Sequence, residues 1–305
     1  MSVLVTGACG MIGGQVIELL LSRGERVIGF DARPPTDEII GSIPFVRGDL
    51  NDAPRLYGAL KRHDVRRIVH AGAISAPFIE ADNPYLVCQT NVLGTVQVFE
   101  AARVFGIERV VNFGSVSGYG TVVGDTITEE TPFAPTSVYG VTKAFSDMLG
   151  TVYSKDHGLD VISLRPSLVY GPRRPSWEPV REMIRGGIEG LPVQLDAAPD
   201  QTHAPVYARD VARAVIAALA VRDPEIRSFN IGGNERTTLA ATAALVRTIV
   251  PGPPIEFQQP ATDPSIPRPA RLDYSAATRI LGYVPEWPLE RAIADYAVWL
   301  REHNS

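Results

Sequence analysis

Apolar residues occur along the first half of the chain in short runs of strand length, separated by segments with helical periodicity. The runs are apolar throughout, which is typical of strands that are covered on both faces. We predict strands at 3–6, 26–30, 45–46, 67–70, 109–113 and 161–164, and helices at 11–22, 53–62, 85–105 and 138–157. This alternation predicts an α/β fold with a doubly wound parallel sheet and right-handed crossovers.

The pattern changes after Pro166. Prolines and glycines become dense between residues 172 and 192, and seven prolines lie between residues 251 and 269, so we predict loops there. Helical patterns return at 208–221, 239–250 and 289–301, with strand-like pieces at 228–231 and 255–257. We therefore expect a first domain at 1–165 and a smaller α/β lobe at 166–305 that shares some elements with the first.

Composition and charge narrow the class of protein. The 305 residues, 45% of them apolar and 21% charged, suffice for a sizeable core and exclude wholesale disorder. The 29 basic and 34 acidic residues leave a net charge of −5, which argues against a nucleic-acid partner. No apolar run has the length of a membrane span and no basic leader is present, so we expect a cytoplasmic protein. Two cysteines, Cys9 and Cys88, and five scattered histidines predict neither a disulfide framework nor a metal site.

A glycine-rich turn stands between the first predicted strand and the first predicted helix. Residues 6–13 read TGACGMIG and place Gly7, Gly10 and Gly13 at intervals of three. The first glycine permits a tight turn, the second lets backbone approach a pyrophosphate, and the third lets the helix pack close to the strand. The helix N-terminus adds free N–H groups and a positive dipole end. A glycine turn without a ligand is the alternative, which the strand–turn–helix context disfavours.

An acidic residue closes the second predicted strand. Asp31 comes 18 residues after Gly13, where a carboxylate accepts hydrogen bonds from both ribose hydroxyls and repels a 2′-phosphate. It therefore favours NAD over NADP, although the nearby Arg33 makes the preference incomplete. A simple turn residue ahead of the two prolines at 34 and 35 is the alternative. Asp49, after the third predicted strand, is a weaker candidate for the adenine edge.

Three polar residues in the middle of the chain indicate proton chemistry. Tyr139 and Lys143 are four residues apart on a predicted helix, so they share a face. Tyrosine is a poor base at neutral pH, but an adjacent ammonium and an oxidised nicotinamide would stabilise its phenolate. Tyr139 can then accept a hydroxyl proton while hydride leaves the same carbon, with Ser115 holding the substrate oxygen. A surface helix that carries this spacing by chance is the alternative, which the upstream glycine turn disfavours.

Motifs over nearly the whole chain carry a family resemblance. They are TGACGMIG at 6–13, DA at 31–32, GDL at 48–50, HAGA at 70–73, NVLGT at 91–95, GSVSGYG at 114–120, YGVTK at 139–143, RPSLVYGP at 165–172, DVARA at 210–214 and LGYVP at 281–285. In this order they resemble the extended short-chain dehydrogenases/reductases of the NAD-dependent epimerase/dehydratase family. The resemblance implies a Rossmann fold with NAD bound to the 1–165 domain and substrate bound to the 166–305 lobe.

The resemblance also implies a role for each matching position. Catalysis would rest on Ser115, Tyr139 and Lys143. Contacts to NAD would come from Gly7, Gly10, Met11, Ile12, Gly13, Asp31, Asp49, Leu50, Ala71, Ala73, Asn91, Tyr139, Lys143 and Pro166. Tyr119 and Tyr170 match aromatic positions of the family, but packing explains them equally well. His70 is expected to be a hydrogen-bonded core histidine.

Three departures from the family pattern concern the substrate. Val116 and Ser117 replace the Asp–Glu pair with which dehydratases of this family eliminate water, so dehydration is disfavoured. Ser167 stands where nucleotide-sugar enzymes often have asparagine, and His203 stands where an arginine usually grips a diphosphate, which makes a weaker and pH-dependent anion ligand. Other arginines offer replacements, although a solvated loop charge is the alternative for each and the simpler interpretation. The substrate candidates are Ser115, Ser117, Arg173, His203 and Arg268, with Arg174 and Arg271 as further cations.

The cofactor chemistry is thus better defined than the substrate, a small molecule. We expect an NAD-dependent oxidoreductase that transfers hydride at a secondary alcohol of a sugar-like or small polyhydroxy compound. The alternative is a nucleotide-sugar 4-epimerase that keeps NAD bound and forms a transient ketone. A cofactor-binding sensor is a third interpretation, which the intact group of Ser115, Tyr139 and Lys143 disfavours.

We also expect a homodimer. The family typically dimerises through the helices predicted here at 85–105 and 138–157. The second has an apolar stripe formed by Val141, Phe145, Met148, Leu149 and Val152. Packing of this stripe on the protein's own sheet is the alternative.

Overall fold

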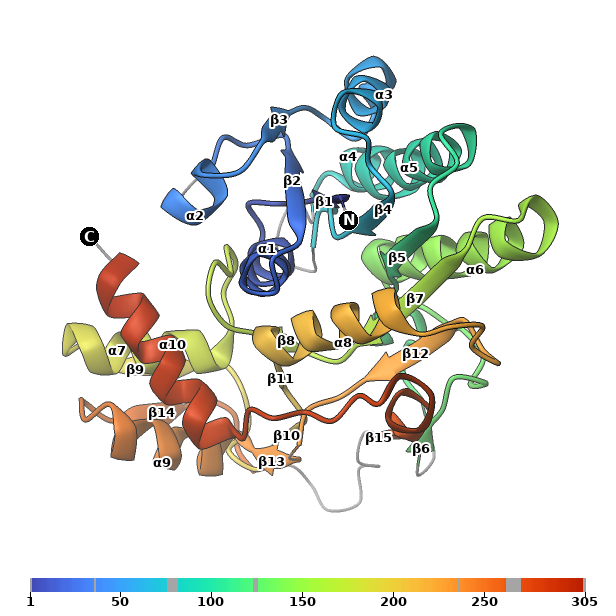
Figure 1. Cartoon of the computed structure of the whole chain (residues 1–305). Coiled ribbons are helices and arrows are strands. Elements are labelled where there is room, and N and C mark those ends of the chain that lie inside the picture. The colour runs from blue at the N-terminus through green and yellow to red at the C-terminus, as the bar shows by residue number, and fades with distance from the viewer. Residues whose placement is uncertain are drawn as a thin grey trace.

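A seven-stranded parallel sheet forms the centre of the computed structural model, which describes residues 2–35, 37–75, 82–122, 126–234, 236–261 and 270–303. The strand order is β12-β7-β5-β4-β1-β2-β3 (Figure 1). The strands are β1 (Ser2–Thr6), β2 (Arg26–Asp31), β3 (Phe45–Arg47), β4 (Arg67–His70), β5 (Arg109–Phe113), β7 (Val161–Pro166) and β12 (Ser228–Ile231). The predicted doubly wound α/β fold is thereby confirmed.

Helices cover both faces of the sheet because each presents an apolar side to it (Figure 1). On one face lie α1 (Met11–Ser22) and α8 (Ala208–Ala220), which share a core with residues such as Val16, Ile17 and Val211. On the other face lie α3 (Ala53–Arg62), α5 (Gly94–Val104) and α6 (Val138–His157), whose core includes Leu56 and Phe99. The edge strand β12 and the covering helix α8 both come from the second half of the chain.

A third core lies beside the sheet. It is formed by α7 (Pro179–Glu189), α9 (Leu239–Ile249) and α10 (Leu289–His303) around buried residues such as Ile184, Val246 and Tyr296. Short strand pairs complete this part and its junctions: β9 (Val193–Leu195) with β14 (Ile255–Phe257), β8 (Val169–Tyr170) with β11 (Val206–Tyr207), β10 (Thr202–His203) with β13 (Thr237–Thr238), and β6 (Thr126–Ile127) with β15 (Arg271–Leu272). Two further helical turns are η2 (Val116–Gly118) and η3 (Ala277–Leu281).

Helix α7 lies where the dense prolines and glycines predicted a loop, so that prediction is wrong. Glu178 caps the helix by accepting hydrogen bonds from the N–H groups of Val180 and Arg181. The glycines serve close packing instead of breaking the helix. A Cβ at Gly186 would lie 2.1 Å from the Cγ2 atom of Val193, so only glycine fits between α7 and β9.

The remaining differences from the prediction are local. The helix predicted at 85–105 is a continuous helical run made of α4 (Pro84–Cys88), a π-helical segment η1 (Gln89–Leu93) and α5. A short helix, α2 (Glu38–Gly41), was not predicted; Asp37 caps it by accepting a hydrogen bond from Ile40. In the described part of the chain, no helix combines the length and the apolar character needed to cross a membrane.

Candidate functional site

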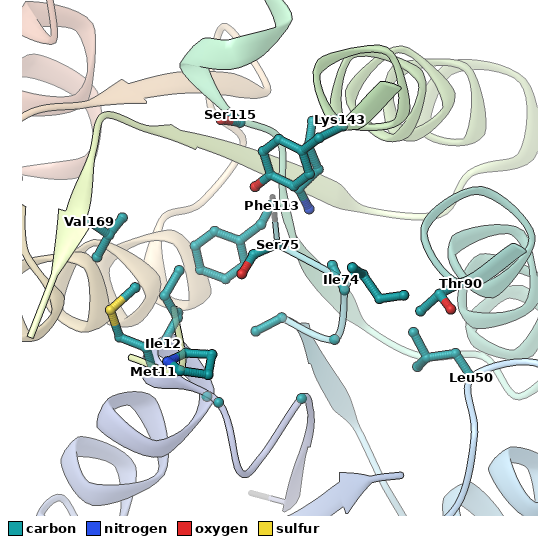
Figure 2. A pocket seen from close by; sticks show the side chains of 18 of the residues that line it. Met11, Ile12, Leu50, Ile74, Ser75, Thr90, Phe113, Ser115, Lys143 and Val169 are labelled. Carbon is teal, nitrogen blue, oxygen red and sulfur yellow. The ribbon is translucent and has the colours of Figure 1, made fainter. Parts of the chain in front are cut away.

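A cavity of about 680 Å³ opens at the carboxyl ends of β1, β2, β4, β5 and β7. This is the edge at which open α/β sheets bind their ligands, and β1 lies at the point where the strand order reverses. The start of α1, which carries Met11 and Ile12, forms one side of the cavity, and Ser115 and Lys143 lie on another side (Figure 2). Segments distant in the sequence therefore surround one space.

The glycine turn after β1 has the geometry that its sequence predicts. Gly7 has a φ of +67°, and a Cβ there would lie 2.7 Å from the backbone of Ala71 and Gly72. A Cβ at Gly13 would lie 2.1 Å from the carbonyl oxygen of Gly7, so the third glycine lets the helix close onto the turn. Gly10 precedes α1 without a side-chain cap, which leaves the first N–H groups of the helix free for an anion. All three glycines line the cavity. This cradle fits a dinucleotide pyrophosphate.

Asp31 lies at the end of β2 and also lines the cavity. Its Oδ2 atom accepts a hydrogen bond from the N–H of Cys9 at 2.9 Å, and its Oδ1 atom accepts one from the N–H of Arg33 at 2.9 Å. These bonds fix the carboxylate beside the glycine turn. Burial raises the pKa of the Cys9 thiol to about 11, so this cysteine stays a neutral packing group. The carboxylate has lone pairs left for ribose hydroxyls.

Behind the cavity wall, Asn91 supports the segment that follows β4. Its side chain exchanges hydrogen bonds with both backbone groups of Ile74, at 2.8 and 3.0 Å, and donates to the hydroxyl of Thr142. Asp49, Leu50, Ala71 and Ala73 line the cavity as expected, whereas Asn91 is buried and does not. Asn91 therefore acts on the site through Ile74. His70 is buried between two threonine hydroxyls, as a core histidine should be.

Ser115, Tyr139 and Lys143 all line the cavity, next to Pro166 at the end of β7. Ser115 caps η2 and accepts a hydrogen bond from the N–H of Ser117 at 3.1 Å. Tyr139 and Lys143 lie one turn apart on α6, and the Nζ atom of Lys143 is 6.0 Å from the centroid of the Tyr139 ring. The helix begins there because Ser137 accepts a hydrogen bond from Gly140 at 3.1 Å.

Burial sets the electrostatics of this group. It raises the pKa of Tyr139, while a hydrogen bond from Ser115 and the charge of Arg174 act in the opposite direction. Burial lowers the pKa of Lys143 to about 8, against the influence of Asp147. Tyr139 is therefore protonated at neutral pH until further positive charge reaches it.

A buried polar network lies behind helix α6. The guanidinium of Arg165 on β7 bonds both oxygens of Asp147 on α6, at 2.7 and 2.9 Å. It also donates to the hydroxyl of Tyr119 at 2.7 Å, and Tyr119 donates to Asn230 at 2.8 Å. Tyr119 is thus a packing and hydrogen-bonding residue outside the cavity lining. Tyr170 is likewise buried, against the ring of Tyr207.

The structure separates the substrate candidates. Ser115 and Ser117 line the cavity, together with Arg174, whose Nη1 atom donates to the carbonyl of Val169 at 2.7 Å. Arg173 is buried in ion pairs with Glu18 and Asp37 and does not line the cavity. His203 and Arg271 do not line the cavity either: His203 bonds Thr242 at 2.8 Å and Arg271 is in β15. The remaining candidate, Arg268, lies outside the described residues.

Apolar and small residues of the lining carried no motif and were not predicted. They include Phe30 and Phe113 on the sheet, Ile74 and Ser75 after β4, and Leu86 and Thr90 on α4 and η1. Figure 2 shows Phe113 between the Met11–Ile12 side and the Ser115–Lys143 side. The sequence did offer a signal for Phe30 and Phe113, because each lies at the end of a predicted strand and close to a predicted site residue. In the described ranges no group of three or more His, Cys, Asp or Glu side chains could hold a metal ion.

These features define a dinucleotide-binding enzyme of the Rossmann type. A family model, the NAD dependent epimerase/dehydratase family, matches residues 3–232, and the chain belongs to that family. It is therefore an extended short-chain dehydrogenase/reductase that uses NAD, as the sequence motifs implied.

Relatives match the chain over its whole length. A UDP-glucose 4-epimerase of Mycolicibacterium smegmatis is 30% identical and covers 100% of both chains. A dTDP-glucose 4,6-dehydratase of Xanthomonas campestris is 28% identical over 97% of this chain and 92% of its own. The solved UDP-glucose 4-epimerase of Thermus thermophilus with NAD has a TM-score of 0.86 at 29% identity, covering 99% of this chain and 100% of its own.

Proposed function

We propose that this protein is a nucleotide-sugar 4-epimerase that oxidises and re-reduces a secondary alcohol with bound NAD. One observation carries the proposal: Ser115, Tyr139 and Lys143 line the same cavity as the glycine cradle and Asp31. The relative that is 30% identical over both full lengths is a UDP-glucose 4-epimerase. It supports placing the epimerase ahead of the dehydrogenase, the reverse of the order expected from the sequence.

The residues that would hold NAD follow from the cavity. Gly7, Gly10 and Gly13, with the free N–H groups at Met11 and Ile12, would bind the pyrophosphate. Asp31 would accept the ribose hydroxyls, and Asp49, Leu50, Ala71, Ala73 and Pro166 would form the surrounding walls. When bound, NAD supplies the hydride acceptor and donor.

Tyr139 would act as the proton acceptor. In this proposal Ser115 holds the reacting oxygen and Tyr139 takes its proton as hydride leaves the carbon. Because burial raises the pKa of Tyr139, the phenolate needs neighbouring positive charge, which Arg174, Lys143 and an oxidised cofactor supply together. The protein's part is to hold these groups in a fixed geometry away from bulk water.

The cavity wall argues against dehydration. Val116 and Ser117 form η2 beside Ser115 and line the cavity, so the place for an acid–base pair is taken by an alkyl group and a hydroxyl. Neither side chain can both remove a carbon-bound proton and protonate a leaving hydroxyl at neutral pH.

A dehydrogenase that releases NADH is the second candidate. His203 favours it, because its Nε2 atom bonds Thr242 and burial lowers the pKa of its imidazole to about 4. A neutral, engaged histidine is a poor ligand for a diphosphate. A site that gains no charge from His203 suits a small, uncharged product better than a nucleotide sugar.

One assay separates these functions. The purified protein is mixed with NAD and a panel of UDP-sugars, dTDP-sugars and free sugars, and the NADH absorbance and the sugar isomers are followed together. Isomer interconversion without net NADH supports the epimerase, whereas stoichiometric NADH supports the dehydrogenase. A 4-keto-6-deoxy product would contradict both.

The role of Tyr139 is tested by Tyr139→Phe. We expect turnover to fall about 10²- to 10⁴-fold, the usual contribution of a positioned acid–base group, while NAD affinity stays unchanged. Tyr153→Phe is the matched control on the same helix, because its hydroxyl bonds Glu100 outside the cavity. Full turnover by Tyr139→Phe would remove Tyr139 from the mechanism.

We also propose a homodimer, as the resemblance implied. Helix α6 turns small and polar residues toward the protein and leaves Val141, Met148 and Val152 about half exposed, at 52, 59 and 46%. Packing on the protein's own core accounts for Leu149 of this stripe but not for Val141, Met148 and Val152. Tyr85 on α4 and Leu93 on η1 are also exposed. Met148→Glu should halve the mass in solution measured by light scattering, and an unchanged dimer would exclude α6 as the interface.

A further inference from the structure

Arg173, in the loop after β8, is a buried cation that the proposed chemistry does not use. Only 6% of its side chain is exposed, and it does not line the cavity. Its backbone has a φ of +64°, a conformation uncommon for a non-glycine residue. Surrounding contacts must therefore hold it in place, since both the buried charge and the backbone conformation are unfavourable alone.

Those contacts come from the N-terminal half of the chain. The Nη2 atom of Arg173 is 2.7 Å from Oε1 of Glu18 on α1, and its Nε atom is 2.7 Å from Oδ2 of Asp37, the residue that caps α2. Both carboxylates are themselves largely buried, with 23 and 14% of their side chains exposed. The two ion pairs are thus shielded from solvent, where such contacts are strongest.

Gly14 makes room for this side chain. A Cβ at Gly14 would lie 2.7 Å from Cδ of Arg173 and 2.9 Å from its Nε and Nη1 atoms. The guanidinium therefore packs directly on the first turn of α1, beside the glycine cradle. Any side chain at residue 14 would displace it.

The neighbours of Arg173 in the chain form the cavity wall. Arg174 and Pro175 line the cavity, as do residues 167–169 before the loop, and the charge of Arg174 acts on Tyr139. Asp37, on the other side of the ion pair, follows the segment 31–33, which also lines the cavity. One buried side chain thus ties together two walls of the same cavity.

We propose that Arg173 is a positioning residue that holds the 171–175 loop closed over bound NAD and slows its release. This inference rests on the proposed function, because an epimerase must keep the cofactor from oxidation of the substrate until its re-reduction. Opening the loop separates two buried ion pairs and leaves Glu18 and Asp37 without their cation. The latch formed by Arg173, Glu18 and Asp37 makes that opening infrequent.

The test compares Arg173→Met with Arg109→Met in the full-length protein. Arg109 also forms a partly buried ion pair, with Asp160 at 2.6 Å, but it does not line or border the cavity. NAD is bound to each protein and its release is followed by fluorescence after rapid dilution, and unfolding is measured in urea. We expect Arg173→Met to release NAD about 10- to 100-fold faster and Arg109→Met to release it at the wild-type rate, although both lose stability.

Milder variants keep the test decisive if Arg173→Met does not fold. Asp37→Asn retains the helix cap, and Glu18→Gln retains a polar side chain of the same size; each removes one charge of the latch. Each should accelerate NAD release severalfold, and Gly14→Ala should do the same by displacing Arg173. Release rates equal to those of the wild type and of Arg109→Met would overturn the proposal.

NAD release is measured without any substrate, so its outcome does not depend on which reaction the protein catalyses. A Tyr139→Phe protein that still turns over would refute the proposed chemistry and leave the latch standing. Unaltered NAD release in the latch variants, together with wild-type epimerisation, would refute the latch and leave the chemistry standing.

Discussion

The two ends of the cavity are formed by different kinds of groups, backbone at one end and loop side chains at the other. The expected cofactor end consists mainly of backbone and glycines after β1, with the carboxylates of Asp31 at the end of β2 and Asp49 after β3. The substrate end consists of side chains on loops and short elements after β5 and β7, among them Ser117, Leu168 and Arg174. Backbone geometry tolerates few sequences, whereas loop side chains vary freely, so the first end reveals its ligand class and the second does not.

The largest effect on NAD binding is expected from adding one carbon at the cofactor end of the cavity. In Gly13→Ala the new Cβ would lie 2.1 Å from the carbonyl oxygen of Gly7, so the turn must shift. We expect more than about 100-fold weaker NAD binding and a loss of about 1–3 kcal/mol in the free energy of unfolding, typical of overpacking.

Gly58→Ala is the control for that variant, because a Cβ at this position on α3 meets nothing within 4 Å. It should bind NAD normally and gain about 0.5–1 kcal/mol of stability, as glycine-to-alanine changes do inside helices. NAD titration and urea unfolding measure both effects. Wild-type NAD affinity in Gly13→Ala would show that the turn does not hold the pyrophosphate.

An intermediate effect is expected at Asp31. Asp31→Ala should weaken NAD binding about 10- to 100-fold, which corresponds to charged hydrogen bonds of about 1.5–3 kcal/mol, and should weaken NADP binding less because a repulsive charge is removed. Because Asp31 also accepts a bond from Cys9, Asp31→Asn is measured beside it. Equal losses for the two cofactors would show that Asp31 acts only on the turn.

The smallest effect is expected at His203. Burial lowers the pKa of its imidazole to about 4, so it is neutral across the range from pH 5 to 8. His203→Asn should leave the pH profile of kcat/KM unchanged in that range and change KM less than about threefold. A profile that moves with this variant would place a titrating His203 at the substrate.

Stability should depend on His203 in a defined direction. The unfolded chain binds a proton near the ordinary histidine pKa of about 6.5, and the folded chain does so only near pH 4, so stability falls as the pH drops between those values. The loss is at most about 1.4 kcal/mol per pH unit, and His203→Asn should show less of it. Urea unfolding at pH 7 and pH 5 measures the difference.

Much of the fold was predictable because its signals are local. The helices at 11–22, 53–62 and 138–157 have the predicted ends, since caps such as Ser137 and Asp52 act within one turn. Helix α7 was missed because Gly186 and Gly187 look like helix breakers until Val193 and Val250 are seen against them. Most residues expected to bind the cofactor line the cavity, since their signals are local too, whereas the apolar lining was not predicted because apolar residues look alike in a core and in a cavity wall.

The sequence by itself determined the class of enzyme, because a glycine turn, Asp31 and a tyrosine–lysine spacing each impose a local geometry that few other functions require. Only the tertiary structure decided which arginine faces the cavity. Arg173 and Arg174 are neighbours with the same chemistry, yet one lines the cavity and the other is buried against Glu18 and Asp37. Their difference depends on residues more than a hundred positions away, which meet the loop only when the chain has folded.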